Sequence, residues 1–258
     1  MNHGICGWSR SRVVGLSLVL FAVTAGVKCD NSLDPFEGPG THVLFIGNSL
    51  TYANELPGTV AGIMRLAGEQ MSYHVVAKPD FALYDHYTGG SDAVEQVQRG
   101  GWHYVILQQG PSSLPASRAS LIQWTVDFDR LIRPTGARTA LYMVWPSKDR
   151  FQFFEDVRRS YELAADTVGG LFLPAGEAWL TAWQDSAQLA LYGPDDFHPS
   201  EIGSFLAALV IFEKISGRNA LDLPSQTIAQ VLKTTTETAL LIQQAAHNTN
   251  LKYEEKSE

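Results

Sequence analysis

Three residues in two distant segments have the types and spacing that nucleophilic catalysis requires. Ser49 lies in the segment Gly47–Thr51, directly after the apolar run His42–Ile46, which is typical of a buried β-strand. Asp195 precedes His198 by three residues, so one loop can supply both a general base and the carboxylate that orients it. A hydroxyl at a strand end and a His–Asp pair together predict a hydrolytic Ser-His-Asp site.

Each of these residues also has an ordinary structural interpretation. Ser49 is a suitable N-cap for a following helix, and Gly-Asn-Ser is a common turn. His198 comes directly before Pro199 and could begin a helix, with Asp195 and Asp196 as turn formers. The catalytic interpretation is favoured because it explains both segments at once: a strand-end Ser followed by Leu-Thr, and a distant Asp-x-x-His-Pro.

Alternating strands and helices must position these segments. Strands are expected at 42–46, 72–77, 104–107, 139–145 and 171–173, and helices at 56–66, 93–99, 119–131, 151–165, 199–215 and 228–246. This order implies βαβ units and a parallel sheet that helices cover on both faces. Sites in such sheets lie at the carboxyl ends of the strands, where Ser49, Gln108 and Gln109 are expected.

Composition limits the partners without naming a substrate. The chain has 258 residues and is 45% hydrophobic, enough to bury the core of one α/β domain, expected at 42–250. A net charge of −8 argues against nucleic acid or an anionic membrane surface as the main partner. The histidines have no metal-ligand spacing, and the glycines form no phosphate-binding motif. We therefore expect neither a metal nor a nucleotide cofactor.

The N-terminal segment 1–29 is predicted to be a signal peptide or an N-terminal anchor. Basic residues precede an apolar stretch, Val13–Val27, that is short for a membrane span. Cys29 would suit lipid attachment, but Lys28 before it is a poor match to the small residue expected there. The prediction is therefore an exported protein, periplasmic or extracellular, whose only membrane contact would be this anchor. A linker at 30–41 and a charged, solvated tail at 251–258 would flank the domain.

Two blocks of the sequence resemble a known family. Val43–Thr51 resembles the first block of the SGNH hydrolases, also called the GDSL esterase and lipase superfamily, and Asp195–Ser200 resembles their last block. The blocks occur in the family's order, and the resemblance spans about residues 42–216. It implies an α/β fold, a three-layer α/β/α sandwich with a parallel, flavodoxin-like sheet, and no metal or organic cofactor.

The resemblance also implies roles for individual residues. Ser49 would be the nucleophile, His198 the base and Asp195 the orienting acid. Asn48 stands where many members have Asp, a departure that some bacterial members share.

The oxyanion hole of the family is harder to match. Its glycine would be Gly89 or Gly90, and the sequence does not choose between them. No Asn occupies the family's carboxamide position, so Gln109 is the first choice for that donor, Gln108 the second and Ser112 the third. The alternative is that these polar residues simply end a strand.

Three further residues are candidates for the substrate pocket. Tyr52, Trp145 and Glu177 are expected near the same sheet edge, although core packing is the more common role of a tryptophan. The leading hypothesis is a serine esterase acting on O-acyl or O-acetyl groups of carbohydrates or on short-chain esters. An O-acyltransferase on the same fold and a catalytically silent glycan-binding protein are the alternatives. The sequence leaves the acyl chain length and the oligomeric state open.

Overall fold

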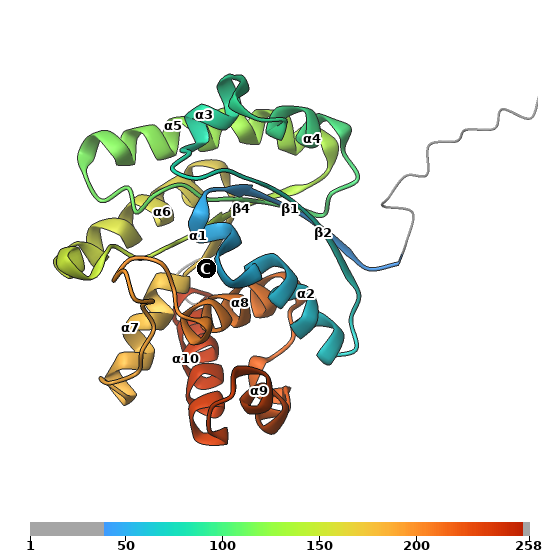
Figure 1. Cartoon of the computed structure of the whole chain (residues 1–258). Coiled ribbons are helices and arrows are strands. Elements are labelled where there is room, and N and C mark those ends of the chain that lie inside the picture. The colour runs from blue at the N-terminus through green and yellow to red at the C-terminus, as the bar shows by residue number, and fades with distance from the viewer. Residues whose placement is uncertain (1–38, 255–258) are drawn as a thin grey trace, which may run out of the picture. The chain divides into compact units, whose positions relative to one another are not determined.

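The computed structural model describes residues 39–254, in which a parallel sheet lies between two sets of helices (Figure 1). The strands are β1 (Thr41–Gly47), β2 (Met71–Ala77), β3 (Tyr104–Leu107), β4 (Arg138–Tyr142) and β5 (Leu171–Leu173). Their order in the sheet is β2-β1-β3-β4-β5, and every neighbouring pair is parallel. The predicted three-layer sandwich with a flavodoxin-like sheet is confirmed.

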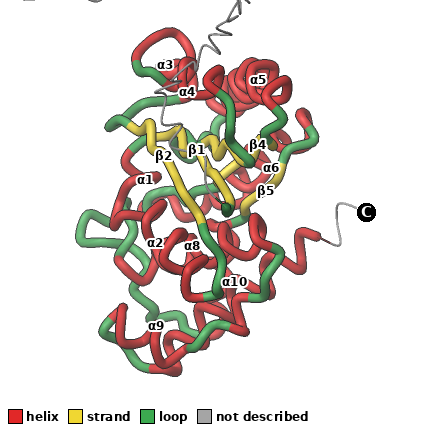
Figure 2. The backbone as a smooth tube through the Cα atoms, turned by 90° about the vertical axis from the view of Figure 1, so that its right-hand side faces the viewer, coloured by secondary structure: helices red, strands yellow, loops and turns green. Residues whose placement is uncertain are grey.

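The interior strand β1 has an uninterrupted apolar sequence, and its burial explains why. Val43, Leu44, Phe45 and Ile46 are all fully buried, whichever face of the sheet their side chains point to. Figure 2 shows the strands side by side with helices beyond both faces of the sheet. A parallel strand covered on both faces needs apolar residues at consecutive positions rather than at alternate ones.

Two sets of helices cover the two faces of the sheet. On one face α5 packs against α4 and α6, and on the other α8 packs against α2, α7 and α10. These helices are α2 (Leu56–Leu66), α4 (Ala93–Arg99), α5 (Pro115–Ile132), α6 (Phe154–Val168), α7 (Ala175–Asp185), α8 (Glu201–Ser216) and α10 (Thr236–Glu254). Helix α8 is apolar nearly all round because it also packs against α10 on the side away from the sheet.

The strand order reverses beside β1, and this reversal creates the place for a site. The chain leaves β1 toward β2 on one side and later returns to form β3 on the other side of β1. In an open α/β sheet the crevice at such a reversal is the usual ligand site. Ser49 follows β1, and Gln108 and Gln109 directly follow β3, so both segments meet at this crevice.

One predicted helix is wrong, and one helix was missed. The single helix predicted at 228–246 is wrong, because the chain forms α9 (Ser225–Leu232) and α10 with a break between them. Lys233 has a left-handed backbone with φ of 51°, and the Thr235 hydroxyl accepts a hydrogen bond from the Thr238 N–H. A left-handed residue followed by a capping threonine ends one helix and starts another. Helix α7 was not predicted at all.

The predicted strand at 139–145 ends earlier, at Tyr142. Met143, Val144 and Trp145 remain fully buried but leave the strand and lead toward the site.

The domain ends later than the predicted boundary at residue 250. Helix α10 continues to Glu254, and the Tyr253 hydroxyl is buried against Glu177 Oε2 at 2.8 Å. The predicted tail 251–258 therefore begins inside a packed helix. The signal or anchor predicted at 1–29 lies outside the described residues, as does the linker up to residue 38. Within 39–254, no helix has the length and apolarity that crossing a bilayer requires.

Candidate active site

Ser49, His198 and Asp195 lie in one hydrogen-bonded chain. Ser49 is the first residue of α1 (Ser49–Tyr52), directly after β1. Its Oγ lies 2.9 Å from His198 Nε2, and His198 Nδ1 lies 2.6 Å from Asp195 Oδ2. Opposite ends of the domain sequence therefore supply a hydroxyl, an imidazole and a carboxylate in the order that a nucleophile, a base and an orienting acid require.

The Asp195 carboxylate is stabilised in its ionised form. The hydrogen bond to His198 is the largest of the causes that lower the pKa of Asp195 to about 2. The backbone N–H groups of Phe197 and His198 add to it by donating to Oδ1 at 3.1 and 2.9 Å. An ionised carboxylate at Nδ1 holds the imidazole with Nε2 directed at Ser49 and would stabilise the imidazolium form.

A buried carboxamide holds the turn that carries Ser49. Gln108 Oε1 accepts hydrogen bonds from the Asn48 N–H at 2.9 Å and the Thr51 hydroxyl at 2.7 Å, while Nε2 donates to Asn48 Oδ1 at 3.0 Å. A Cβ on Gly47 would lie only 2.4 Å from Gln108 Oε1, so only glycine fits at the strand end. Gln108 thus positions the turn of Ser49, and both ends of its side chain are already bonded.

His86 supports the same turn from the opposite side. Its fully buried ring places Nε2 2.8 Å from the Gly47 carbonyl oxygen and Nδ1 2.7 Å from Ser91 Oγ. Burial is the main cause that lowers the pKa of His86, so the ring is neutral at neutral pH. Nε2–H then donates to Gly47, and Nδ1 accepts from Ser91. No spacing in the sequence points to His86, because its partner lies 39 residues away.

The loop that carries His198 is held by a tryptophan and by backbone hydrogen bonds. Trp145 Nε1 donates to the Phe197 carbonyl at 3.0 Å, and the Lys148 N–H donates to the Asp196 carbonyl at 2.9 Å. The Trp145 ring is fully buried and stacks on Trp179 with 3.6 Å between the ring centres. Side chains of the loop itself are more open: those of Asp195 and His198 are 53% and 40% exposed.

A cavity of about 340 Å³ opens beside Ser49. It is lined by Asn48, Ser49, Asp80, Phe81, Ala82, Gln109, Gly110, Pro111, Ser112, Ser117 and Phe197. Three of these residues, Asp80–Ala82, follow β2 and were not predicted. Their sequence signal is the turn Lys78-Pro79-Asp80, in which Asp80 adopts a left-handed backbone with φ of 61°.

Comparison with known proteins identifies the fold. No protein-family model and no curated protein matches the sequence. A solved DUF4886 family protein from Bacteroides uniformis covers 82% of this chain and 95% of its own, with 18% identity and a TM-score of 0.67. A candidate SGNH hydrolase from Slackia heliotrinireducens covers 68% and 99%, with 23% identity and a TM-score of 0.57. The chain has the fold of the SGNH hydrolases.

A third solved structure with this fold is a catalytic mutant of an acetylxylan esterase from Geobacillus stearothermophilus. It covers 69% of this chain and 95% of its own, with 17% identity and a TM-score of 0.53. At such low identity the likeness concerns the SGNH fold, and the chemistry has to be argued from the site itself.

The structure does not bring the predicted glycines to the cavity of this SGNH fold. Gly89 and Gly90 are not among its lining residues, and the Gly90 carbonyl accepts a hydrogen bond from Lys78 Nζ instead. The reason is geometric: after β2 the chain reaches the cavity at Asp80–Ala82, before it arrives at the two glycines.

The three residues considered for a carboxamide or hydroxyl donor differ in position. The Gln108 carboxamide is hydrogen-bonded within the Ser49 turn, whereas Gln109 and Ser112 line the cavity. Gln109 Nε2 donates to Ser112 Oγ at 2.8 Å and makes only a long contact of 3.5 Å with the Ser117 carbonyl. One side-chain N–H of Gln109 therefore has only a weak hydrogen-bond partner and is available to donate to a ligand.

None of the predicted substrate-pocket residues lines the cavity beside Ser49. Tyr52 is 39% exposed outside it, and Trp145 is in the core beneath the His198 loop. Glu177 is buried in α7, where Oε2 accepts the Tyr253 hydroxyl. We expected these residues near Ser49 because they follow strands that end at the same edge of the sheet. Position after a strand does not specify in which direction a side chain points.

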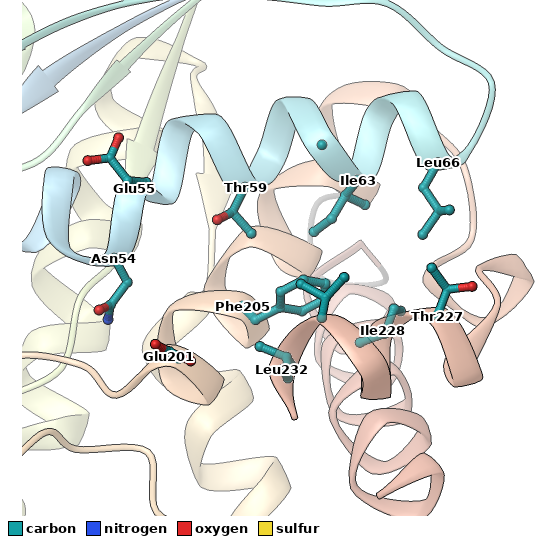
Figure 3. A pocket seen from close by; sticks show the side chains of 12 residues that line it. Asn54, Glu55, Thr59, Ile63, Leu66, Glu201, Phe205, Thr227, Ile228 and Leu232 are labelled. Carbon is teal, nitrogen blue, oxygen red and sulfur yellow. The ribbon is translucent and has the colours of Figure 1, made fainter. Parts of the chain in front are cut away.

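A second groove, of about 560 Å³, lies between α2, α8 and α9. Figure 3 shows its mainly apolar lining, with Asn54, Glu55 and Glu201 at one end and Leu66 and Thr227 at the other. It holds none of the three hydrogen-bonded residues of the candidate site. Within residues 39–254, no group of three or more His, Cys, Asp or Glu side chains could hold a metal ion.

Proposed function

We propose that this protein is a serine esterase that hydrolyses carboxylic esters through an acyl-enzyme intermediate. The observation that carries the proposal is the chain Ser49 Oγ–His198–Asp195, with separations of 2.9 and 2.6 Å, at the edge of an open cavity. Proteins similar in fold include an acetylxylan esterase and a lipase/acylhydrolase from Enterococcus faecalis, which supports ester chemistry at this site.

The first half of the reaction forms the acyl-enzyme. Ser49 Oγ attacks the ester carbonyl carbon while its proton passes to His198 Nε2, and the ionised Asp195 stabilises the resulting imidazolium. The tetrahedral intermediate then collapses, the bond to the alcohol oxygen breaks, and His198 returns the proton to the leaving alcohol. In the second half, water attacks the acyl carbon and gives its proton to His198. The bond to Ser49 Oγ then breaks, His198 returns the proton to that oxygen, and the carboxylic acid leaves.

The negative charge on the carbonyl oxygen needs hydrogen-bond donors. Ser49 is the first residue of α1, so its N–H has no helical carbonyl to bond and can donate to the oxyanion. We assign the second donor to Gln109 Nε2, whose contact with the Ser117 carbonyl is 3.5 Å long. Removing one such donor typically raises the barrier by about 2.7–4 kcal/mol.

The size of the cavity argues for a small acyl group. A volume of about 340 Å³ lies at the low end of the range for ligand sites, and the triad loop is exposed. An O-acetyl or other short acyl group on a carbohydrate fits these dimensions, because the alcohol part can remain outside. We also propose that the protein is exported, as its first 29 residues predict. Export would place it near such glycans.

The test compares wild type with Ser49→Ala on 4-nitrophenyl acetate and butyrate. Ser216→Ala is the matched control, because its hydroxyl only caps the end of α8, where it donates to the Phe212 carbonyl. We expect a burst of 4-nitrophenol followed by turnover in wild type and control, and neither in Ser49→Ala. Equal rates in all three proteins would overturn the proposal.

The same assay with a sugar acceptor separates hydrolysis from acyl transfer. Formation of an acylated sugar at the expense of free acid would identify a transferase with the same nucleophile. Absence of any Ser49-dependent turnover, with retained binding of a glycan, would favour a silent binding protein.

A further inference from the structure

A second depression lies next to the cavity beside Ser49. This second depression has a volume of about 370 Å³ and is also lined by Ser113, Leu114, Pro146, Ser147 and Arg150. Pro111, Ser112, Ser117 and Phe197 line both. Because four residues line both, the two depressions lie side by side, and we refer to them together as the groove, with Ser49 lining one part and Arg150 the other. A substrate attached at Ser49 can extend toward Arg150.

Arg150 has no carboxylate partner among residues 39–254. No Asp or Glu of the described chain lies within 4 Å of its guanidinium nitrogens, whereas Arg118 and Arg133 are each paired with an aspartate. The contacts of Arg150 are a long one of 3.5 Å from Nη2 to Ser113 Oγ and a position 5.0 Å from the Phe153 ring centre. Most of its N–H donors therefore remain available to a ligand.

The other charges nearby do not offer a similar cation to a ligand in the groove. Lys148, two residues earlier, is already paired with Asp196 at 3.0 Å and lines a different depression. The whole chain has a net charge of −8, so anions are not attracted to its surface in general. A single guanidinium without a carboxylate partner, in the depression next to that of the nucleophile, is thus a selective feature.

We propose that Arg150 is a specificity-determining residue that binds a carboxylate on the ester substrate, with the Ser113 hydroxyl beside it. This proposal rests on the proposed esterase function. The planar fork of a guanidinium matches the two oxygens of a carboxylate, which a neutral side chain cannot reproduce. The carboxylate can belong to the acyl part, as in a half-ester of a dicarboxylic acid, or to the alcohol part, as in an acetylated uronic acid.

Two matched substrate pairs test this and distinguish the two sources. On the acyl side, mono-4-nitrophenyl succinate is compared with 4-nitrophenyl butyrate. On the alcohol side, acetylated methyl galacturonoside is compared with acetylated methyl galactoside, with released acetate as the readout. The proteins are wild type, Arg150→Met and the control Arg159→Met, which removes an exposed arginine of α6 that lines no part of the groove.

We expect Arg150→Met to lower kcat/KM about tenfold for the charged member of one pair, mainly through KM, as when a charge-assisted hydrogen bond is lost. The neutral member should change by less than about twofold, since an exposed charge contributes little to folding. Arg150→Lys should recover only part of the preference, because an ammonium cannot bind bidentately. An effect on the succinate pair assigns the carboxylate to the acyl side, and an effect on the uronate pair assigns it to the alcohol.

The proposal is overturned if neutral esters are hydrolysed and neither charge preference changes in Arg150→Met. If wild type hydrolyses no ester, the esterase proposal fails, and the carboxylate site is then tested by binding alone. NMR titration of Ser49→Ala with methyl galacturonoside and with methyl galactoside, with and without Arg150→Met, gives the two Kd values. Equal Kd values for the charged sugar in both proteins would overturn the assignment of Arg150.

Discussion

The turn that carries Ser49 and the loop that carries His198 are built in different ways. The turn is largely buried, and it is held by the side chains of Gln108, directly after β3, and of His86, in the segment after β2. The loop is open to solvent, and it is held by backbone hydrogen bonds and by exposed side chains such as Asn54, Lys148 and Asp195. Among residues 39–254, Trp145 is the one fully buried side chain that donates a hydrogen bond to the loop, through the Phe197 carbonyl.

This difference predicts that substitutions in the two regions affect stability and catalysis to different degrees. Buried hydrogen-bonding groups lose much free energy when one partner is removed, because the other can no longer reach water. Exposed groups can exchange a lost partner for water at little cost. We therefore expect changes in the turn to affect both folding and rate, and changes in the loop to affect mainly rate.

The largest effect is expected from Asp195→Asn in the exposed loop. Loss of the carboxylate removes the charge that stabilises the His198 imidazolium, and kcat should fall by about 10³–10⁴-fold. The free energy of unfolding should change by less than about 1 kcal/mol, because the side chain is half exposed. Asp196→Asn is the control, since its left-handed backbone with φ of 55° suits Asn equally well. A large loss of stability in Asp195→Asn would remove the contrast between loop and turn.

The next effect is expected from Gln108→Leu in the buried turn. The Asn48 N–H and the Thr51 hydroxyl would lose their acceptor, so the free energy of unfolding should fall by about 3 kcal/mol in urea unfolding. Ester hydrolysis should fall with it, even under conditions where the protein is folded. Gln123→Leu, on the exposed face of α5, serves as control. An unchanged midpoint together with an unchanged rate would show that the turn does not depend on Gln108.

A smaller effect is expected from Trp145→Phe. This change keeps an aromatic ring on Trp179 but removes the Nε1–H that donates to the Phe197 carbonyl. Stability should fall by about 1–2 kcal/mol, from the lost hydrogen bond and the smaller ring. Because the loop carries the base, kcat should fall more than KM rises. An effect confined to KM would mean that Trp145 acts on substrate binding instead.

The smallest effect concerns the pH dependence of the loop. The pKa of Asp195 is lowered to about 2 in the folded protein, below its ordinary value of 3.8. Its ionisation therefore stabilises the fold above pH 3.8, and this contribution disappears as the pH falls through 2. In His198→Gln the pKa of Asp195 should rise, because its main hydrogen-bond donor is lost. ¹³C NMR titration of the carboxyl group measures it, and an unchanged pKa would contradict the role given to His198.

Much of the fold could be predicted from local patterns. The runs at 104–107 and 171–173 become β3 and β5 as expected, and the helical pattern at 56–66 becomes α2. The predictions for these segments are correct because apolar periodicity and turn residues act over a few positions. The helix predicted at 228–246 fails because a left-handed Lys233 interrupts a pattern whose periodicity alone looks continuous.

The residues of the candidate site also fall into those that local patterns predict and those that they do not. Ser49, Asp195 and His198 could be proposed from the sequence because their spacing is local within two segments and a parallel sheet brings strand ends together. Gln108 illustrates the limit: its position after a strand indicated a donor to the substrate, whereas the fold turns its carboxamide onto the Ser49 turn. The direction of a side chain depends on neighbours that are distant in the chain.

Local patterns in the chain were enough to predict the type of sheet, the positions of most strands and helices, and the two segments that meet at its edge. The packing of distant segments was needed to show which polar groups face the cavity, that His86 supports the turn of Ser49, and that Arg150 lines the depression next to that of Ser49. The two kinds of information differ because the underlying interactions differ in range. Periodicity is written in consecutive residues, but cavities and buried hydrogen bonds arise where segments far apart in the chain pack against one another.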